Sequence, residues 1–387
     1  MLKGNFPVDK FKELDTPFYY YDMALLRRTL DIVREQCARN PLFTVHYAVK
    51  ANANPVILST IAAAGFGADC VSGGEIKAAL AAGFRPETIV FAGVGKSDSE
   101  IITGLGAGIA RFNVESLPEL KVIDSFAGVM GKVAHISLRV NPDVGAHTHA
   151  NITTGLSENK FGINYEQLEN IIKAAMVLPN IQFEGLHFHI GSQILDMSDF
   201  VALCNRINEL AVKLRNAGLP LGDINVGGGL GINYEHPNHL NIAEFKSYFD
   251  TFRNHLDVGR NVKIHFELGR SIVAPCGSLI SRVLYVKEGT TRKFAVIDGS
   301  MTELIRPALY KAYHRVENIS SDEAEEIYDV VGPVCESSDV FVKGASIDRC
   351  HRGDFIAIRS AGAYGESMAS CYNCRPLPKA YFSDRLF

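Results

Sequence analysis

Eight short apolar runs, separated by segments whose apolar residues have helical spacing, constrain the fold of this chain more than any other feature. Strands that alternate with helices in eight units predict an α/β fold, a closed (β/α)8 barrel of the TIM type. The predicted strands are Thr44–Lys50, Gly67–Val71, Thr88–Gly93, Ala110–Val114, His135–Val140, Phe183–Ile190, Ile224–Gly229 and Lys263–Leu268. The predicted helices include Pro55–Ala64, Gly74–Ala82, Ser116–Phe126, Tyr165–Val177, Phe200–Ala217 and Ala243–Leu256.

A second domain is expected after the barrel, where β-rich runs continue with few helices between them. Its predicted strands are Leu279–Lys287, Lys293–Asp298, Glu326–Val331 and Asp354–Ile358. We therefore predict a barrel domain at residues 24–270 and a β-rich domain at residues 271–387. Residues 1–23, which contain the run Pro17–Asp22, are predicted to join the β-rich domain.

The composition argues against several classes of protein. The chain of 387 residues has a net charge of −4 and no long run of like charge, so a nucleic-acid partner is not expected. The amino terminus is charged where a secretory signal is apolar, and no later segment is continuously apolar over the width of a bilayer. We therefore expect a cytoplasmic protein without a membrane partner. Eight scattered cysteines predict free thiols rather than a disulfide framework.

Polar or glycine residues stand where four of the predicted strands end. The first strand ends in Lys50, the sixth in His187–Ser192, the seventh in Gly227–Gly231 and the eighth in Glu267–Arg270. Active-site residues of such barrels lie at the carboxyl ends of the strands, so these groups are predicted to meet there. The long connection Asn141–Asn164 is predicted to be a loop over the same face.

Lys50 follows an apolar strand, so we expect its amine to lie inside the fold. Burial disfavours the charged form, and a neutral amine is what imine formation with a carbonyl cofactor requires. A lysine that extends from a strand end to solvent is the alternative. Gly228 and Gly229 expose backbone N–H groups to a phosphate, although glycines also serve tight turns. Glu267 is suited to pair with a ring nitrogen, or alternatively with Arg270.

Together these groups predict a site for pyridoxal 5'-phosphate, with its aldehyde on Lys50. His189 is predicted to stack on the cofactor ring and His187 to be a packing residue. No metal is predicted, because no Cys, Asp or Glu lies at a recognised ligand spacing from either histidine. The pair Cys371 and Cys374 has no second pair, and we interpret its members as small buried residues rather than a zinc or redox site.

Several motifs, in the same order along nearly the whole chain, resemble the barrel-type pyridoxal phosphate decarboxylases, and within them the diaminopimelate decarboxylases. In the barrel they are His46–Asn52, His187–Ser192, Gly227–Gly229 and Glu267–Arg270. In the second domain they are Met301–Tyr310, Gly332–Asp339 and Ala361–Gly365. Leu268 and Ser338 depart from the residues usual in the family, but neither change removes a functional group.

The resemblance implies a set of site residues and an assembly. The catalytic residues would be Lys50, which holds the cofactor, and Cys335, which donates a proton. The cofactor-binding residues would be Lys50, His189, Ser192, Gly228, Gly229, Glu267, Gly269, Arg270 and Tyr364. The substrate-binding residues would be Arg270, Arg306, Tyr310, Glu336 and Tyr364. A homodimer is also implied, in which the cysteine loop enters the barrel of the partner subunit.

Charge matching predicts the substrate, because a buried charge without a partner is costly. The far end of meso-2,6-diaminopimelate carries a carboxylate, which Arg270, Arg306 and Tyr310 can bind, and an amine, which Glu336 can meet. We therefore expect its decarboxylation to L-lysine and carbon dioxide, the last step of lysine biosynthesis. Arg306 in a surface ion pair and Tyr310 in ordinary packing are the alternatives.

Other activities remain open from the sequence. The nearest is a decarboxylase of ornithine, arginine or carboxynorspermidine. An amino-acid racemase has a similar barrel but should lack the pair Cys335 and Glu336, and a non-catalytic regulatory relative should not need both Lys50 and Cys335.

Overall fold

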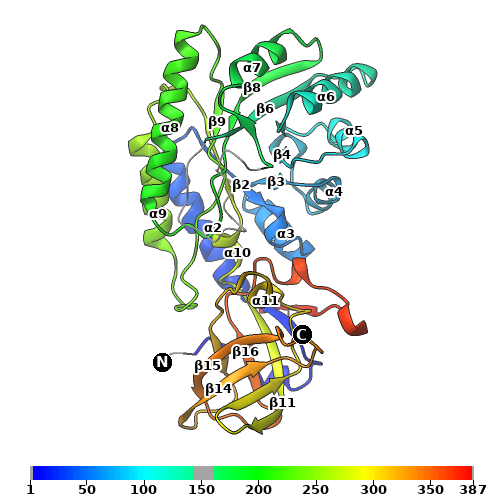
Figure 1. The fold of residues 1–387 in the computed structure, drawn as a ribbon, viewed down its shortest axis with the longest axis vertical. Coiled ribbons are helices and arrows are strands. Elements are labelled where there is room, and N and C mark those ends of the chain that lie inside the picture. Colours follow the sequence, from blue (N-terminus) through cyan, green and yellow to red (C-terminus); the bar gives the residue numbers. More distant parts are fainter. Residues whose placement is uncertain (1–2, 143–159, 386–387) are drawn as a thin grey trace. The chain divides into compact units, whose positions relative to one another are not determined.

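The computed structural model describes residues 3–142 and 160–385, which divide into two compact units (Figure 1). The barrel unit consists of Leu30–Gly231 and Asn241–Gly269. The sheet unit consists of Met1–Thr29, Ile232–Leu240 and Arg270–Phe387.

The barrel unit is built on eight parallel strands, as the sequence predicts. They are β2 (Phe43–Ala48), β3 (Gly67–Cys70), β4 (Ile89–Phe91), β5 (Arg111–Val114), β6 (Ala134–Asn141), β8 (Ile181–His187), β9 (Asp223–Asn225) and β10 (Ile264–Leu268). The last strand pairs with the first, with Ile264 opposite Phe43 and Leu268 opposite Tyr47, so the sheet closes on itself. Closure of parallel strands brings all their carboxyl ends to one face.

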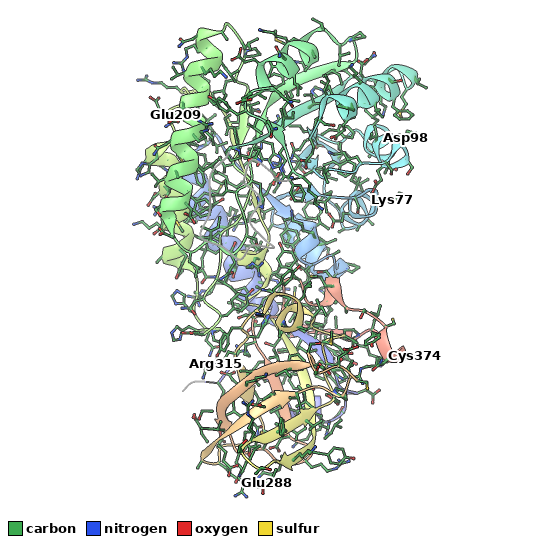
Figure 2. All side chains as sticks on the ribbon, in the orientation of Figure 1. Lys77, Asp98, Glu209, Glu288, Arg315 and Cys374 are labelled. Atoms are coloured by element: carbon green, nitrogen blue, oxygen red, sulfur yellow. The ribbon has the colours of Figure 1, made fainter. Side chains whose placement is uncertain are left out.

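Helices connect the strands. They are α2 (Met23–Ala38), α3 (Pro55–Ala63), α4 (Gly73–Ala81), α5 (Asp98–Ala107), α6 (Leu117–Val129), α7 (Leu168–Val177), α8 (Met197–Asn216) and α9 (Ile242–His255). Ser72 and Ser116 cap α4 and α6 by accepting a backbone N–H, which fixes where each helix begins. Figure 2 shows the exposed charged side chains of Lys77, Asp98 and Glu209 on α4, α5 and α8.

The sheet unit confirms the β-rich second domain. Its strands run in the order β13 (Val316–Asn318), β16 (Phe355–Ile358), β11 (Gly277–Glu288), β12 (Lys293–Ile297), β14 (Glu325–Val331) and β15 (Val340–Asp348). β1 (Phe18–Tyr21) pairs antiparallel with β11 and parallel with β17 (Lys379–Phe382), so the early aromatic run is a strand of this sheet. Short helices complete the unit: α1 (Val8–Phe11), α10 (Arg270–Val273) and α11 (Arg306–Tyr310).

The division into units differs from the predicted domains, and part of one predicted loop lies outside the described residues. Residues 24–29, the segment Ile232–Leu240 and Arg270 cluster with the sheet unit, whereas the sequence analysis placed them within the barrel domain. The domain boundaries 24–270 and 271–387 remain a prediction. Of the predicted loop Asn141–Asn164, residues 143–159 lie outside the described residues, and Ile163–Asn164 forms β7, which pairs with β6. Among the described helices, none is both long and apolar enough to cross a membrane.

An aromatic cluster packs the outer face of β10 against α9. The ring centroid of Phe266 lies 4.9 Å from that of Phe43, 4.9 Å from that of Phe249 and 5.3 Å from that of Phe252. Phe266 is fully buried, so its side chain contributes apolar area on every side.

Replacement of Phe266 by alanine tests this packing. The cavity left behind should lower the free energy of unfolding by about 3–5 kcal/mol, measured by urea denaturation. The control is Val177→Ala on α7, a side chain that is 80% exposed, which should change the free energy of unfolding by less than about 0.5 kcal/mol. A loss below about 1 kcal/mol for Phe266→Ala would contradict the packing described.

Candidate active site

Lys50 lies beyond the end of its strand, in the single turn Val49–Ala51 that follows β2. Its side chain is 39% exposed, and its Nζ lies 3.7 Å from Oδ2 of Asp69. The expected burial of this side chain is therefore partial: its amine lies beside a buried acid while part of the side chain is exposed. The strand stops at Ala48 and the chain turns, which brings the side chain to the carboxyl-terminal face of the barrel instead of its core. An amine in this position can be reached by a ligand.

Asp69 on β3 is a buried acid that the sequence analysis missed. The residue is fully buried, and neither of its carboxylate oxygens accepts a hydrogen bond from the described residues. Burial, together with the negative charge of Glu267, raises the pKa of Asp69 well above its usual range, and the nearby Lys50 opposes this shift only in part. A carboxyl group within the otherwise apolar run Gly67–Cys70 is the signal that identifies it in the sequence.

Glu267 on β10 is held by donors from three other strands. Asn225 Nδ2 donates to its Oε1 over 2.7 Å, Asn113 Nδ2 donates to the same oxygen over 3.3 Å, and His187 Nε2 lies 3.1 Å from Oε2. Burial raises the pKa of Glu267, but the charge and hydrogen bond of His187 together with the charge of Lys50 outweigh it and lower the pKa overall. Glu267 is therefore a charged carboxylate inside the barrel.

His187 differs from its predicted role, because it donates to a buried carboxylate and is more than a packing residue. Strand alternation predicts which face a side chain occupies, but not which group meets it across the barrel. The sequence analysis also missed Asn113 and Asn225. Asparagine is unfavourable within strands, so its presence in β5 and β9 was an available signal.

The glycine run after β9 is required by close backbone contact. A Cβ atom on Gly228 would lie 1.9 Å from the carbonyl oxygen of Glu267, and Gly229 has a φ of 109°. Gly269 packs beside the lysine turn, where a Cβ would meet that of Ala51 at 3.0 Å. Larger residues would separate β9 from β10 and move Glu267 away from its partners.

His189 stands beside this run and is partly exposed, as is Ser192. The backbone N–H of Gly228 donates to His189 Nδ1 over 3.3 Å, so Nδ1 is the ring nitrogen without a proton. Burial of the ring, followed by the charges of Lys50 and Arg139, lowers the pKa of His189 well below its usual range. The imidazole is therefore a neutral flat ring next to the glycines.

The barrel unit fits a pyridoxal phosphate on its own geometry. An accessible amine, a buried carboxyl group without hydrogen bonds among the described residues, a charged carboxylate and a glycine run all meet at one face. Lys50, His189, Ser192, Gly228, Gly229, Glu267 and Gly269 are the predicted residues in this unit. Their individual roles stay predictions.

In the sheet unit, three predicted residues gather around Tyr234. Arg270 Nη1 and Arg306 Nη1 both donate to the Tyr234 hydroxyl, over 2.7 and 2.9 Å. Arg270 Cζ lies 4.9 Å from the ring centroid of Tyr364. Tyr364 has a φ of 56°, a left-handed conformation that bulky residues adopt only when the surroundings enforce it. Tyr310 ends α11, the helix that Arg306 begins.

Cys335 and Glu336 are exposed on the loop between β14 and β15. Asn373 Oδ1 accepts the backbone N–H of Cys335 over 3.3 Å, and Tyr372 donates its hydroxyl to Glu336 over 2.7 Å. The segment Cys371–Cys374 therefore lies against the Cys335 loop. Its two cysteines are exposed, so their interpretation as small buried residues is wrong.

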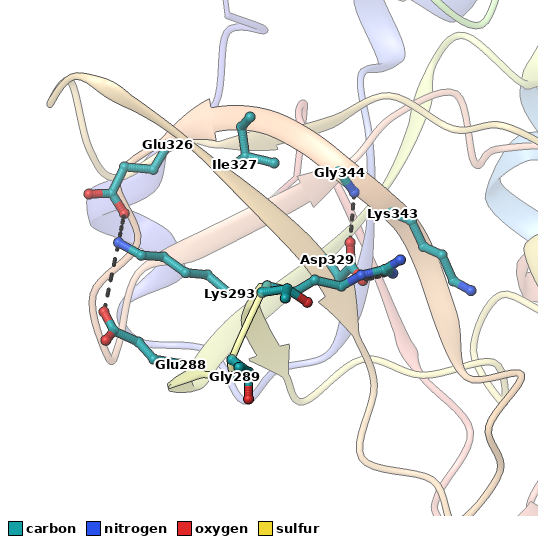
Figure 3. A pocket seen from close by; sticks show the side chains of 11 residues that line it. Glu288, Gly289, Lys293, Glu326, Ile327, Asp329, Lys343 and Gly344 are labelled. Carbon is teal, nitrogen blue, oxygen red and sulfur yellow. Dashed lines mark hydrogen bonds and ion pairs between the residues drawn. The ribbon is translucent and has the colours of Figure 1, made fainter.

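A cavity of about 890 Å³ in the sheet unit contains none of the predicted site residues. It lies between the β11–β12 turn and strands β14 and β15, and its charged groups are largely satisfied by one another (Figure 3). Lys293 Nζ lies 2.9 Å from Glu326 and 3.7 Å from Glu288, and Arg292 Nη1 lies 2.9 Å from Asp329. These pairs indicate a solvated surface rather than a binding site.

Comparison with known proteins agrees with this geometry. The family model "Pyridoxal-dependent decarboxylase, pyridoxal binding domain" matches residues 25–274. The chain is 60% identical over 385 residues to the diaminopimelate decarboxylase of Bacteroides thetaiotaomicron, and the match covers 100% of both chains. The chain belongs to the diaminopimelate decarboxylase family. As a member of this family it is a decarboxylase whose cofactor is pyridoxal phosphate.

Other members of the diaminopimelate decarboxylase family match nearly as completely. The enzyme of Neisseria meningitidis serogroup B is 43% identical over 362 residues, which are 93% of this chain and 86% of that one. The solved structure of the Helicobacter pylori enzyme complexed with L-lysine has a TM-score of 0.91 and 41% identity, covering 97% of this chain and 93% of that one. The lysine/ornithine decarboxylase of Vibrio vulnificus complexed with cadaverine, at 22% identity, TM-score 0.84 and coverage of 98% and 97%, shares the fold.

The variant Glu267→Gln tests the charge of the buried carboxylate. Because the folded state lowers the pKa of Glu267, its charge contributes stability above the unfolded pKa of about 4.3, and this contribution is lost as the pH falls below that value. The difference in free energy of unfolding between parent and variant should shrink by about 0.6 kcal/mol from about pH 6 to about pH 4. Urea titrations at constant ionic strength measure it. A difference that grows over this range would mean that Glu267 is protonated in the folded protein.

Proposed function

We propose that this chain decarboxylates meso-2,6-diaminopimelate to L-lysine and carbon dioxide, the last step of lysine biosynthesis, with pyridoxal phosphate as cofactor. The observation that carries the proposal is the position of Lys50 beside Asp69 at the carboxyl ends of the barrel strands. Support comes from the diaminopimelate decarboxylase that is 60% identical over the full length. The Helicobacter pylori relative was solved with L-lysine, the expected product.

In this proposal each barrel residue has a defined task. Bound pyridoxal phosphate supplies a ring that accepts the electron pair released when the bond to the departing carboxylate breaks. The Lys50 amine would hold the aldehyde, and the charged Glu267 would favour a proton on the ring nitrogen. The neutral His189 ring would lie against the cofactor, and the backbone of Gly228 and Gly229 together with Ser192 would hold its phosphate. Cys335 returns a proton to the carbon that lost its carboxylate.

The substrate follows from the charge of the sheet-unit cluster. Arg270 and Arg306 are only 7% and 5% exposed, so two positive charges are buried side by side. Two buried guanidinium groups suit a carboxylate, which they bind with charge-assisted hydrogen bonds. Diaminopimelate carries such a group at its far end and ornithine does not. The predicted roles of Tyr310, Tyr364 and Glu336 in substrate binding are part of the same proposal.

Turnover of candidate substrates by the parent and an Arg306→Met variant tests this assignment. The parent should release carbon dioxide and lysine from meso-diaminopimelate much faster than it decarboxylates ornithine or arginine. Arg306→Met should lower kcat/KM for diaminopimelate by about 10- to 100-fold, because a charged hydrogen bond to the carboxylate is lost. The control Arg292→Met removes an arginine of the charged cavity and should leave kcat/KM unchanged. Faster turnover of ornithine by the parent would reverse the substrate assignment.

We further propose a homodimer in which the Cys335 loop of one subunit completes the barrel site of the other. The exposure of Cys335 and Glu336 supports this, since a proton donor must be covered during the reaction. A cytoplasmic location without nucleic-acid or membrane partners is proposed on the charge and the amino-terminal sequence.

Mixed dimers test the shared site. Lys50→Ala and Cys335→Ala should each be inactive alone, with Cys335→Ala retaining the absorbance of the bound cofactor. After the two variants are mixed in equal amounts and allowed to exchange subunits, activity should return to about a quarter of the parent value, because half of the dimers are mixed and each has one intact site. No recovery, despite exchange verified by native mass spectrometry, would mean that both residues act within one subunit.

A further inference from the structure

The sheet unit contains a tyrosine whose hydroxyl joins the two arginines assigned to the substrate carboxylate. Tyr234 lies in Ile232–Leu240, directly after the glycine run, and has no assigned role. Its hydroxyl oxygen accepts from Arg270 Nη1 over 2.7 Å and from Arg306 Nη1 over 2.9 Å. A single oxygen therefore sets the separation of two guanidinium groups.

Two guanidinium groups are buried beside one neutral hydroxyl. Burial lowers the pKa of the Arg306 guanidinium, Tyr234 opposes this shift in part, and the positive charge of Arg270 adds to it. For Arg270, Tyr234 and Tyr364 outweigh burial and raise the pKa. Burial raises the pKa of Tyr234, but the charges of Arg270 and Arg306 lower it overall. A neutral phenol between two cations stabilises them less than a carboxylate would. The cluster is therefore suited to bind a negative group.

The hydroxyl of Tyr234 also has a fixed direction. A phenol has two acceptor positions and one O–H donor, and both acceptor positions are used by the arginines. Within the part of the chain that the structure describes, no acceptor is found for this O–H. It must point away from both guanidinium groups and is available to a bound anion.

The ring of Tyr234 is held from two sides. Arg306 Cζ lies 5.3 Å from its centroid, and the His314 ring packs against it edge-on at 5.0 Å. His314 is fully buried, and burial followed by the charge of Arg306 lowers its pKa to about 3, so it adds no further positive charge. Its Nδ1 lies 2.9 Å from the carbonyl oxygen of Arg359, which orients the ring. Tyr234 therefore has little freedom to release either arginine.

We propose that Tyr234 is a specificity-determining residue of the carboxylate site: its hydroxyl holds Arg270 and Arg306 at the spacing of a carboxylate and adds its own O–H as a third donor. This inference rests on the proposed function, because the carboxylate concerned is the one that diaminopimelate and L-lysine share. Cadaverine has the chain and amines of L-lysine but lacks this carboxylate. The ratio of the two affinities therefore measures the carboxylate site alone.

The test compares L-lysine and cadaverine binding by calorimetry to the holoenzyme of the parent, Tyr234→Phe and Tyr248→Phe. Phenylalanine keeps the ring against Arg306 and His314 and removes only the hydroxyl. Tyr248 is the matched control, because it is a buried tyrosine whose hydroxyl has no hydrogen-bond partner among the described residues. Tyr234→Phe should reduce the preference for L-lysine over cadaverine by about tenfold, as expected for a lost charge-assisted contact, and leave cadaverine binding within about twofold. Tyr248→Phe should preserve the parent preference.

The outcomes separate this inference from the proposed function. A Tyr234→Phe enzyme that keeps the parent preference, or that loses affinity for both ligands equally, would overturn the role of Tyr234 and leave the substrate assignment intact. A parent enzyme that binds L-lysine and cadaverine equally would overturn both, since no carboxylate site would exist.

Discussion

The structure depends on one buried carboxylate inside a closed barrel. Glu267 of β10 is held by Asn113 of β5, His187 of β8 and Asn225 of β9, so side chains from four strands meet at one point. Removing a charge from water costs several kcal/mol unless hydrogen bonds replace the water, and three donors do so here. The same donors aim Glu267 into the barrel, and His187 also lowers its pKa. The packing of the strands and the chemistry of the site therefore share one set of contacts.

Two acids with opposite pKa shifts interact with Lys50. Burial raises the pKa of Asp69, whereas the charge and hydrogen bond of His187 together with the charge of Lys50 outweigh burial and lower the pKa of Glu267. Environments that separate the pKa values of nearby acids are typical of catalytic sites. Lys50 lies 3.7 Å from Asp69 with part of its side chain in solvent, so the amine is positioned by a buried group and still open to a ligand. In the sheet unit a buried group also positions charged side chains: the hydroxyl of Tyr234 accepts hydrogen bonds from Arg270 and Arg306.

The barrel and its motifs were predictable, because apolar strands, helix caps and glycines required by close contact are local features of the sequence. The hydrogen-bond partners that side chains meet across the barrel were not predictable. The sequence placed His187 at the end of the sixth strand but did not reveal the carboxylate that it meets, and Asn113 and Asn225 belong to no recognised motif. Lys50 was expected to be buried, because its strand was read two residues too long. Tyr234 was missed, because it lies in an irregular segment of bends and turns that has neither helical nor strand periodicity.

The most direct test of the account is the identity of the residue that carries the cofactor. The protein loaded with pyridoxal phosphate is reduced with borohydride, digested and mapped by mass spectrometry. The account predicts a phosphopyridoxyl group on Lys50, and its loss in Lys50→Ala. A modified lysine elsewhere in the chain, or no modified peptide at all, would contradict the assignment of the site at the end of β2.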